Sequence, residues 1–251
     1  MFNFTTITRD GKLPSRGKIY ATEINPDIVV RSMTTNDEMK RLSYSASPYK
    51  ALADVMNDCC VQKDEKLDAY NMWMPDFQYL MFLVRIATYG GNIRVAEQTC
   101  PKCGQLAECS FDLNDMLVDE IEIPERVIVL PNCQAKIEFN YETPHIHDNI
   151  DTRTKELNQK YGAAAKQDLR LLVELEAYIK TLDGEYPIDS ELNYFIRNCP
   201  MQDMNYLTQK LAACNSVTDV NAKVKCNECG EVILERPFVL TPEFFRPEVR
   251  W

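Results

Sequence analysis

The chain has 251 residues, of which 45% are hydrophobic and 26% charged, and its formal net charge is −10. This length suffices for one large domain or two small ones, either of which can bury a core. The excess of acidic side chains argues against binding nucleic acid, because contacts to phosphates need concentrated positive charge. We expect no membrane span, since no apolar run approaches the ~18 residues that a membrane helix needs.

The sequence also contains ten cysteines. Its first residues lack the basic and apolar regions of a secretory signal, which favours a reducing cytoplasm over a disulfide-forming compartment. Under reducing conditions an isolated cysteine serves as a small apolar residue, whereas cysteines at short spacing are candidate metal ligands. The spacing of the cysteines therefore bears directly on function.

An N-terminal arm and a strand are expected over residues 1–34. Pro14 and Gly17 mark a turn within the arm, and residues 28–31 have the composition of a short strand. The arm itself shows little periodicity, so we expect it to be extended.

A helical part is expected over residues 35–91. Thr35 and Glu38 have the spacing of a capping box, with Thr35 as the N-cap of a first helix. A second helix is predicted over residues 48–56. Pro75 opens a third helix, which is apolar around most of its circumference and ends at paired glycines. Such a helix belongs to the core.

Residues 92–141 show the two-residue period of β-strands and contain a first cysteine motif. The candidate strands are residues 93–98, 106–111, 126–130 and 134–141. The pattern returns to helices over residues 142–219, where an apolar stripe runs from Leu172 to Leu182.

Residues 220–240 are predicted to form two strands around a tight turn with a second cysteine motif, and residues 241–251 form a tail rich in proline and aromatic residues. Prolines discourage a local core in this region, so we expect its aromatic side chains to pack on another surface. These side chains are Phe238, Phe244, Phe245 and Trp251.

The two cysteine motifs are matched fragments, CPKCG at residues 100–104 and CNECG at residues 226–230. In each, two residues separate the cysteines, a spacing that lets both thiolates reach one ion at about 2.3 Å. The glycine that follows permits the positive φ that turns backbone N–H groups toward the sulfur atoms. Four sulfur ligands in a tetrahedron favour zinc. The predicted metal ligands are Cys100, Cys103, Cys226 and Cys229.

A gap of 122 residues separates Cys103 from Cys226, whereas simple zinc ribbons place their halves roughly 15–20 residues apart. We therefore predict an α+β fold in which β-hairpins form a split zinc ribbon around a long helical insertion. A long insertion adds little loop-closure entropy, because that cost grows with the logarithm of the loop length. The alternative is two unrelated surface turns.

A site closed by four thiolates leaves no position for water or substrate, so the predicted zinc is structural. A redox-active dithiol is the rival interpretation of either fragment alone, although neither has a thioredoxin-like context. The remaining cysteines are expected to be packing residues: Cys59, Cys60, Cys109, Cys133, Cys199 and Cys214. Of these, Cys109 lies close enough in sequence to Cys103 to be a substitute ligand.

His145 and His147 form a second candidate site, with Asp148 or Asp151 as a carboxylate ligand. On an extended segment both imidazoles would face one side and could hold a metal for hydrolysis. A polar loop between a strand and a helix is the favoured interpretation, because no third ligand at helical spacing and no phosphate-binding glycine loop accompany them. A nucleophilic serine motif is also missing, so we expect no enzymatic activity.

The order of these features resembles the baseplate hub proteins of T-even-type contractile-tail bacteriophages. The resemblance rests on LPSRGKIY at residues 13–20, IVVRSMTTNDE at residues 28–38, the helix from Pro75 to Gly90 and the CPKCG fragment. It implies a non-enzymatic structural or assembly role in the virion tail baseplate, or in the host cytoplasm during assembly. The implied partners are other hub proteins, the tail tube or the central spike, with self-association within the particle as a further option.

Two other functions stay open. The first is a zinc-ribbon regulator that binds host transcription machinery or nucleic acid, although Lys102, Lys223 and Lys225 are too few for a phosphate-binding face. The second is a metal-dependent hydrolase that uses His145 and His147.

Overall fold

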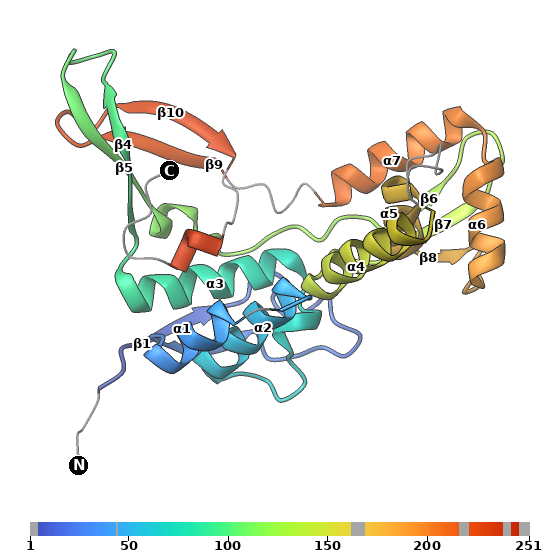
Figure 1. Cartoon of the computed structure of the whole chain (residues 1–251), viewed down its shortest axis with the longest axis horizontal. Helices are drawn as coiled ribbons and strands as arrows, with labels where there is room; N and C mark the ends of the chain where they lie inside the picture. The colour runs from blue at the N-terminus through green and yellow to red at the C-terminus, as the bar shows by residue number, and fades with distance from the viewer. Residues whose placement is uncertain (1–4, 44, 162–168, 216–220, 238–241, 246–251) are drawn as a thin grey trace.

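The structure is a computed structural model of the chain and describes residues 5–43, 45–161, 169–215, 221–237 and 242–245. It combines helices with antiparallel sheets, so the predicted α+β class is confirmed. Figure 1 shows three parts: a base around a central helix, an arm of paired strands above one end of it, and a second lobe beyond the other end.

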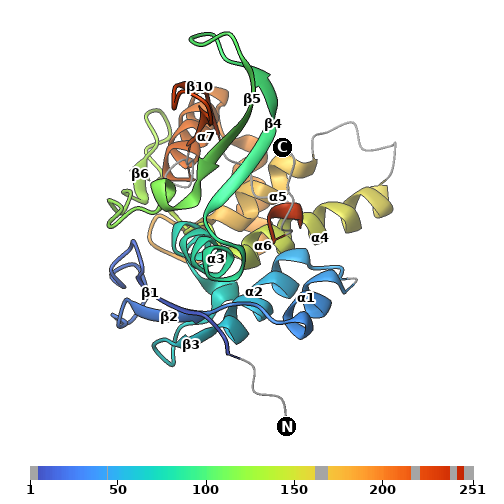
Figure 2. The same ribbon diagram turned by 90° about the vertical axis from the view of Figure 1, so that its left-hand side faces the viewer.

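The base combines a three-stranded sheet with helices. The strands are β1 (Thr8–Lys12), β2 (Asp27–Arg31) and β3 (Cys60–Gln62), paired in that order. The helices are α1 (Thr35–Leu42), α2 (Pro48–Cys59) and α3 (Met74–Tyr89), with a short 3₁₀ turn, η1 (Ala69–Asn71), before α3. Figure 2 shows α3 end-on between this sheet and the arm. Most of α3 is buried, which confirms its place in the core.

The capping box of α1 lies one residue earlier than predicted. Thr34 is the N-cap and Asp37 its partner: the Asp37 N–H donates to Thr34 Oγ1 at 3.4 Å, and the Thr34 N–H donates to Asp37 Oδ2 at 2.7 Å. The prediction of Thr35 with Glu38 was wrong because the segment TTNDE offers two such spacings. Arg31 selects between them, since its guanidinium donates to both carboxylate oxygens of Asp37 at 2.6 and 3.1 Å.

The arm of paired strands, which is not the N-terminal arm predicted over residues 1–34, is a four-stranded antiparallel sheet in the order β10-β9-β5-β4. It is called the arm from here on. Its strands are β4 (Asn92–Thr99), β5 (Leu106–Asp112), β9 (Asn221–Cys226) and β10 (Val232–Pro237). Strands β4 and β5 form one hairpin and β9 and β10 the other, and β5 pairs with β9 where Cys109 lies opposite Cys226. Two hairpins that are distant in sequence therefore form one sheet. After β5, the 3₁₀ turn η2 (Leu113–Met116) returns the chain to the base.

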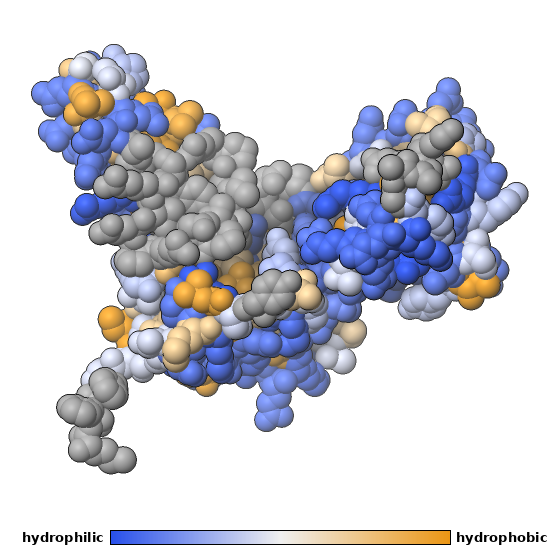
Figure 3. Space-filling model, in the orientation of Figure 1, coloured by the Kyte–Doolittle hydropathy of each residue, from blue (hydrophilic) through white to orange (hydrophobic). Residues whose placement is uncertain are grey.

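The second lobe has its own sheet, β6 (Val127–Val129), β7 (Lys136–Phe139) and β8 (Ile179–Leu182), in that order. Its helices are α4 (Pro144–Tyr161), α5 (Leu169–Tyr178), α6 (Asp189–Asn198) and α7 (Met201–Asn215). A separate apolar core joins them and includes Ile137, Phe139 and Leu207, all buried. Hydrophilic residues dominate the face of this lobe that Figure 3 shows.

The apolar stripe from Leu172 to Leu182 is divided between two elements instead of lying on one helix. The helix α5 ends at Tyr178, and β8 continues the chain beside β7, with Leu182 opposite Ile137. Within β8 the side chains alternate between buried and half-buried positions, a two-residue period that the helical stripe concealed.

The C-terminal 3₁₀ turn η5 (Pro242–Phe245) packs into the core of the base. Phe244 and Phe245 are both buried, and the Arg85 Nε group of α3 donates to the Phe244 carbonyl at 3.0 Å. The prediction that the tail aromatics pack on another surface is confirmed for these two; Phe238 and Trp251 lie outside the described residues. Among the described residues, no helix has both the length and the apolar character needed to cross a bilayer.

Candidate metal centre

Both cysteine motifs form the same turn between the strands of their hairpins. In the first, the Cys100 N–H donates to the Gln105 carbonyl and the Gly104 N–H to the Cys100 carbonyl, each at 2.9 Å. The second turn repeats both bonds from Cys226 at 2.8 Å. Gly104 and Gly230 both have φ of 72°, the left-handed conformation that favours glycine. The glycine of each motif therefore serves the predicted role.

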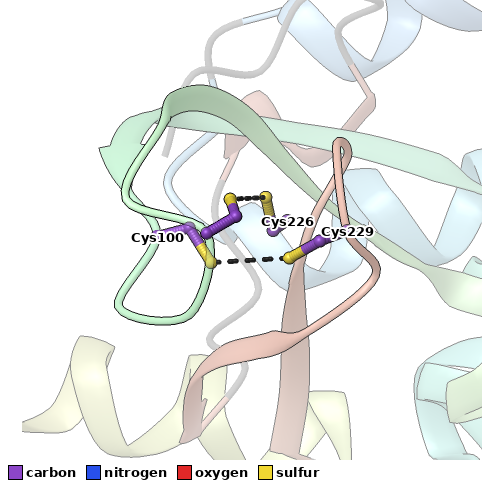
Figure 4. A group of neighbouring side chains, drawn as sticks. Cys100, Cys226 and Cys229 are labelled. Atoms are coloured by element: carbon purple, nitrogen blue, oxygen red, sulfur yellow. Dashed lines mark hydrogen bonds between the residues drawn. The ribbon is translucent and has the colours of Figure 1, made fainter.

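The two turns bring their sulfur atoms together. Cys100 Sγ lies 3.6 Å from Cys229 Sγ, and Cys103 Sγ lies 4.0 Å from Cys226 Sγ. Figure 4 shows Cys100 and Cys229 pointing toward each other from the two hairpins. All four sulfur atoms lie within 4.8 Å of one another. A tetrahedral ion with metal–sulfur distances of about 2.3 Å places its ligands about 3.8 Å apart, so these separations suit such an ion.

The site lies at the surface of the arm, and two of its four cysteines are buried in the sheet. Cys100 and Cys226 are buried in a small apolar cluster with Ala107, whereas Cys103 and Cys229 are exposed. The first cysteine of each turn is thus part of the packing of the sheet, and the second closes the site from outside.

The turns also change the acidity of the thiols. The pKa of Cys100 is lowered to about 7, chiefly because the Cys103 N–H donates to its sulfur, with a further contribution from the Lys102 N–H. At Cys229 the Glu231 N–H lowers the pKa, but partial desolvation and the neighbouring thiols outweigh it and raise the pKa to about 12. One thiolate therefore forms readily, whereas several together need a compensating cation.

Polar contacts outside the sulfur group hold the two turns in register. The Lys102 ammonium lies 2.6 Å from the Glu231 carboxylate, across the two motifs. The Ser110 hydroxyl donates to Asn227 Oδ1 at 2.8 Å, and the Asn227 N–H donates to the Glu108 carbonyl at 3.2 Å.

A family model described as T4 bacteriophage base plate protein matches residues 4–245. The chain belongs to this family. The resemblance drawn from the sequence is therefore confirmed for a bacteriophage baseplate component, whereas the hub subunit stays a prediction. The family implies association with the virion tail and suggests contacts with other baseplate proteins. No curated protein and no solved structure matches the chain.

Cys109, the fifth cysteine near the candidate metal centre of this baseplate protein, is not one of the clustered thiols. Cys109 is fully buried in β5, and its thiol donates to the Ala107 carbonyl at 3.5 Å. The group of four sulfur atoms does not include it. Its role as a substitute ligand stays a prediction without support from this arrangement.

The other cysteines of the baseplate protein differ in their surroundings. Cys59 and Cys60 are buried in the core of the base, as expected of packing residues, and burial raises their pKa values to about 12 and about 11. Cys199 and Cys214 are half-buried and Cys133 is exposed. An exposed thiol is not a packing residue, so the expectation for Cys133 was wrong.

The histidines do not form a joint site. They lie in the first turns of α4, not on an extended segment, and residues two apart on a helix point in nearly opposite directions. His147 Nε2 lies 2.7 Å from a Glu142 carboxylate oxygen, whereas His145 contacts Asn149. Within the described ranges, no group of side chains suited to a metal contains either histidine. The structure therefore has neither the extended segment that a joint site would need nor the polar loop that we favoured, because both histidines lie on a helix.

Asp148, one of the two candidate carboxylate ligands, has a structural role. It is buried, and its two oxygens accept the N–H groups of Tyr49 and Lys50 at 3.2 and 2.8 Å. These N–H groups lie in the first turn of α2 and have no acceptor within the helix. The N-cap residue of α2, Ser47, makes no side-chain cap bond. A helix of the second lobe thereby caps a helix of the base.

Proposed function

We propose that this chain is a structural or assembly component of the baseplate hub, and that one zinc ion fixes the fold of its arm. The family match supports the baseplate part of this proposal. The convergence of four cysteine sulfur atoms from two distant hairpins supports the metal. Four thiolates select zinc over harder cations, and a site without an open coordination position is structural rather than catalytic.

The proposed zinc ligands are Cys100, Cys103, Cys226 and Cys229. The ion would join the hairpin of β4 and β5 to the hairpin of β9 and β10. The strand pairing between these hairpins is short, because the β5–β9 register covers two residue pairs, Cys109 with Cys226 and Ser110 with Lys225. A metal that ties both turns together would therefore set the position of the second hairpin.

Metal analysis of the purified full chain tests this assignment. Cys229→Ala should lose one zinc per chain relative to the unchanged protein, since three thiolates hold the ion less tightly. Cys109→Ala is the matched control, because it removes a thiol from the same sheet outside the sulfur group, and it should keep the metal. Equal zinc content in both variants would refute the assignment.

The hub role makes a separate prediction about partners. Other hub proteins, the tail tube or the central spike are the proposed neighbours, with self-association as an additional outcome. Chemical cross-linking of assembled tails, followed by peptide mass spectrometry, should join lysines of this chain to a hub, tube or spike protein. Cross-links confined to the baseplate periphery would overturn the hub assignment and leave the baseplate role intact.

Neither alternative function gains support from the site. Two of the three lysines beside the cysteine turns are paired, Lys102 with Glu231 at 2.6 Å and Lys225 with Asp115 at 2.8 Å, which neutralises positive charge that phosphates would need. The histidines of the proposed hydrolase make separate contacts. We therefore propose a protein-binding, non-enzymatic role without nucleic acid, in the virion or in the host cytoplasm during assembly.

A further inference from the structure

A third turn in the molecule has the backbone of the two cysteine turns. It joins β6 to β7 in the second lobe. The Leu130 N–H donates to the Ala135 carbonyl at 3.0 Å, and the Gln134 N–H donates to the Leu130 carbonyl at 3.1 Å. Gln134 has φ of 58°, at the position that glycine occupies in the other two turns. The same hydrogen bonds and the same left-handed residue therefore recur a third time.

The third turn keeps one of the two cysteines. Cys133 stands at the position of Cys103 in the first motif, whereas the fully buried Leu130 stands at the position of Cys100. Because leucine offers no ligand atom, a metal at this turn would need an anion from elsewhere in the chain.

Asp203 of α7 supplies that anion. In the first cysteine turn, the backbone N–H groups at the third and fourth positions donate to the sulfur of Cys100. In the third turn these groups belong to Asn132 and Cys133, and they donate to Oδ1 and Oδ2 of Asp203, each at 2.9 Å. The Asn132 side chain adds a bond to Oδ1 at 2.9 Å. The buried carboxylate thus takes the place of the missing thiolate.

A second thiol completes the group. Cys199 follows α6, where its N–H donates to the Phe195 carbonyl at 2.8 Å, and it precedes Asp203 by four residues. The ligand atoms of Cys133, Cys199 and Asp203 all lie within 4.8 Å of one another. We infer that these three side chains form a second metal site, which takes a divalent cation of the zinc type.

The donor set determines the kind of ion and of site. Two thiolates and one carboxylate are ligands that zinc accepts, and the sulfur atoms disfavour magnesium or calcium. Three protein ligands leave one coordination position for a non-protein ligand. Cys133 and Cys199 both line a surface hollow of about 610 Å³, which has room for water or another small ligand beside the ion. This site is therefore open, unlike the four-thiolate site of the arm.

Metal analysis of the full chain, purified with reductant and zinc, tests the inference. Cys133→Ala and Cys199→Ala should each lose one zinc per chain relative to the unchanged protein. Cys214→Ala is the matched control, because it removes a half-buried thiol of the same lobe, and it should lose none. Zinc content equal to that of the unchanged protein in both Cys133→Ala and Cys199→Ala would overturn the inference. Loss of metal only in Cys229→Ala would mean that the arm holds the single metal site.

Alkylation of the unchanged protein gives an answer that does not depend on whether a variant folds. Zinc added to chelator-treated, reduced protein should slow iodoacetamide labelling of Cys133 by at least about tenfold, because a metal-bound thiolate is withheld from the reagent. Labelling of Cys214 should not change. An unchanged labelling rate at Cys133 would overturn the inference. So would a second result: the protein takes up no zinc at this turn, and without reductant Cys133 and Cys199 form a disulfide.

Discussion

The sulfur atoms of Cys100 and Cys229 lie 3.6 Å apart although the two residues are 129 positions apart in the chain. The contact connects two hairpins whose shared strand register is short. Each turn is ordered by its own backbone hydrogen bonds, but nothing local decides that the turns meet. The position of one hairpin on the other is therefore where metal should matter most.

Chelation of the purified chain should loosen the arm more than the base. We expect faster hydrogen exchange at the amides of β9 and β10 after a chelator is added, because ion binding to the folded state stabilises it by about 2.7 kcal/mol at a ligand concentration 100 times Kd. Cys109→Ala should respond like the unchanged protein, and Cys229→Ala should exchange fast before chelation. Equal exchange in the arm with and without chelator would contradict a structural ion.

The pair of Asp37 and Arg31 predicts a pH dependence of stability. The Arg31 guanidinium, followed by the Thr34 donors, lowers the pKa of Asp37 from 3.8 to about 2. Because the folded-state pKa is the lower one, the pair stabilises the fold above pH ~4, and this stabilisation is lost as the pH falls toward ~2. Asp37→Asn should lower the free energy of unfolding at neutral pH by about 1–3 kcal/mol, through the weakened cap and pair.

Urea unfolding between pH 2 and pH 6 would measure this effect. Asp37→Asn should flatten the acid limb of the stability curve. Asp54→Asn is the control, since Asp54 forms an exposed ion pair with Lys50 that contributes about 0.5 kcal/mol or less. An acid limb as steep in Asp37→Asn as in the unchanged protein would show that other carboxylates cause it.

Asp148→Ala should destabilise the contact between the two lobes. The buried carboxylate accepts two N–H groups of α2 and the Tyr70 hydroxyl, and its removal leaves these donors unpaired. The expected loss is about 1–3 kcal/mol in the free energy of unfolding. Asp151→Ala, which removes an exposed carboxylate of the same helix 3.4 Å from Arg170, should cost less than about 1 kcal/mol. Equal losses would show that the cap does not determine the effect.

Gly17→Ala should cost more stability than Gly184→Ala. Both residues have left-handed backbones, with φ of 75° and 89°, so each alanine carries a conformational penalty of about 1–2 kcal/mol. A Cβ atom at Gly17 would also lie 2.2 Å from the Ile24 carbonyl oxygen, whereas one at Gly184 meets nothing within 4 Å. Thermal unfolding of both variants measures the difference, and an equal decrease in Tm would mean that the backbone at Gly17 shifts freely.

Local patterns predicted the parts of the fold that depend on local interactions. The C-x-x-C-G spacing indicated both cysteine turns, because the thiol positions and the left-handed glycine lie within one turn. Alternating residues indicated β4 and β5, and the apolar circumference of α3 indicated its burial. These signals need no knowledge of distant residues.

Predictions failed where a contact outside the local pattern decides between local alternatives. The segment TTNDE allows two capping boxes, and Arg31 selects the one with Asp37. Pairing with β7 separates β8 from α5, and α4 carries the histidines in place of the polar loop that we favoured. In each case local propensity is a weak signal, so contacts with other parts of the chain determine the outcome.

By itself, the sequence determined the α+β class, the candidate zinc ligands and the resemblance to phage baseplate proteins, because spacing and period are properties of neighbouring residues. Only the tertiary structure decided that Cys100 meets Cys229, that Asp148 caps α2, and that Asp203 fills a turn lacking its first cysteine. The physical reason is the same throughout: a side chain meets its partner only where strands and helices from distant segments pack together.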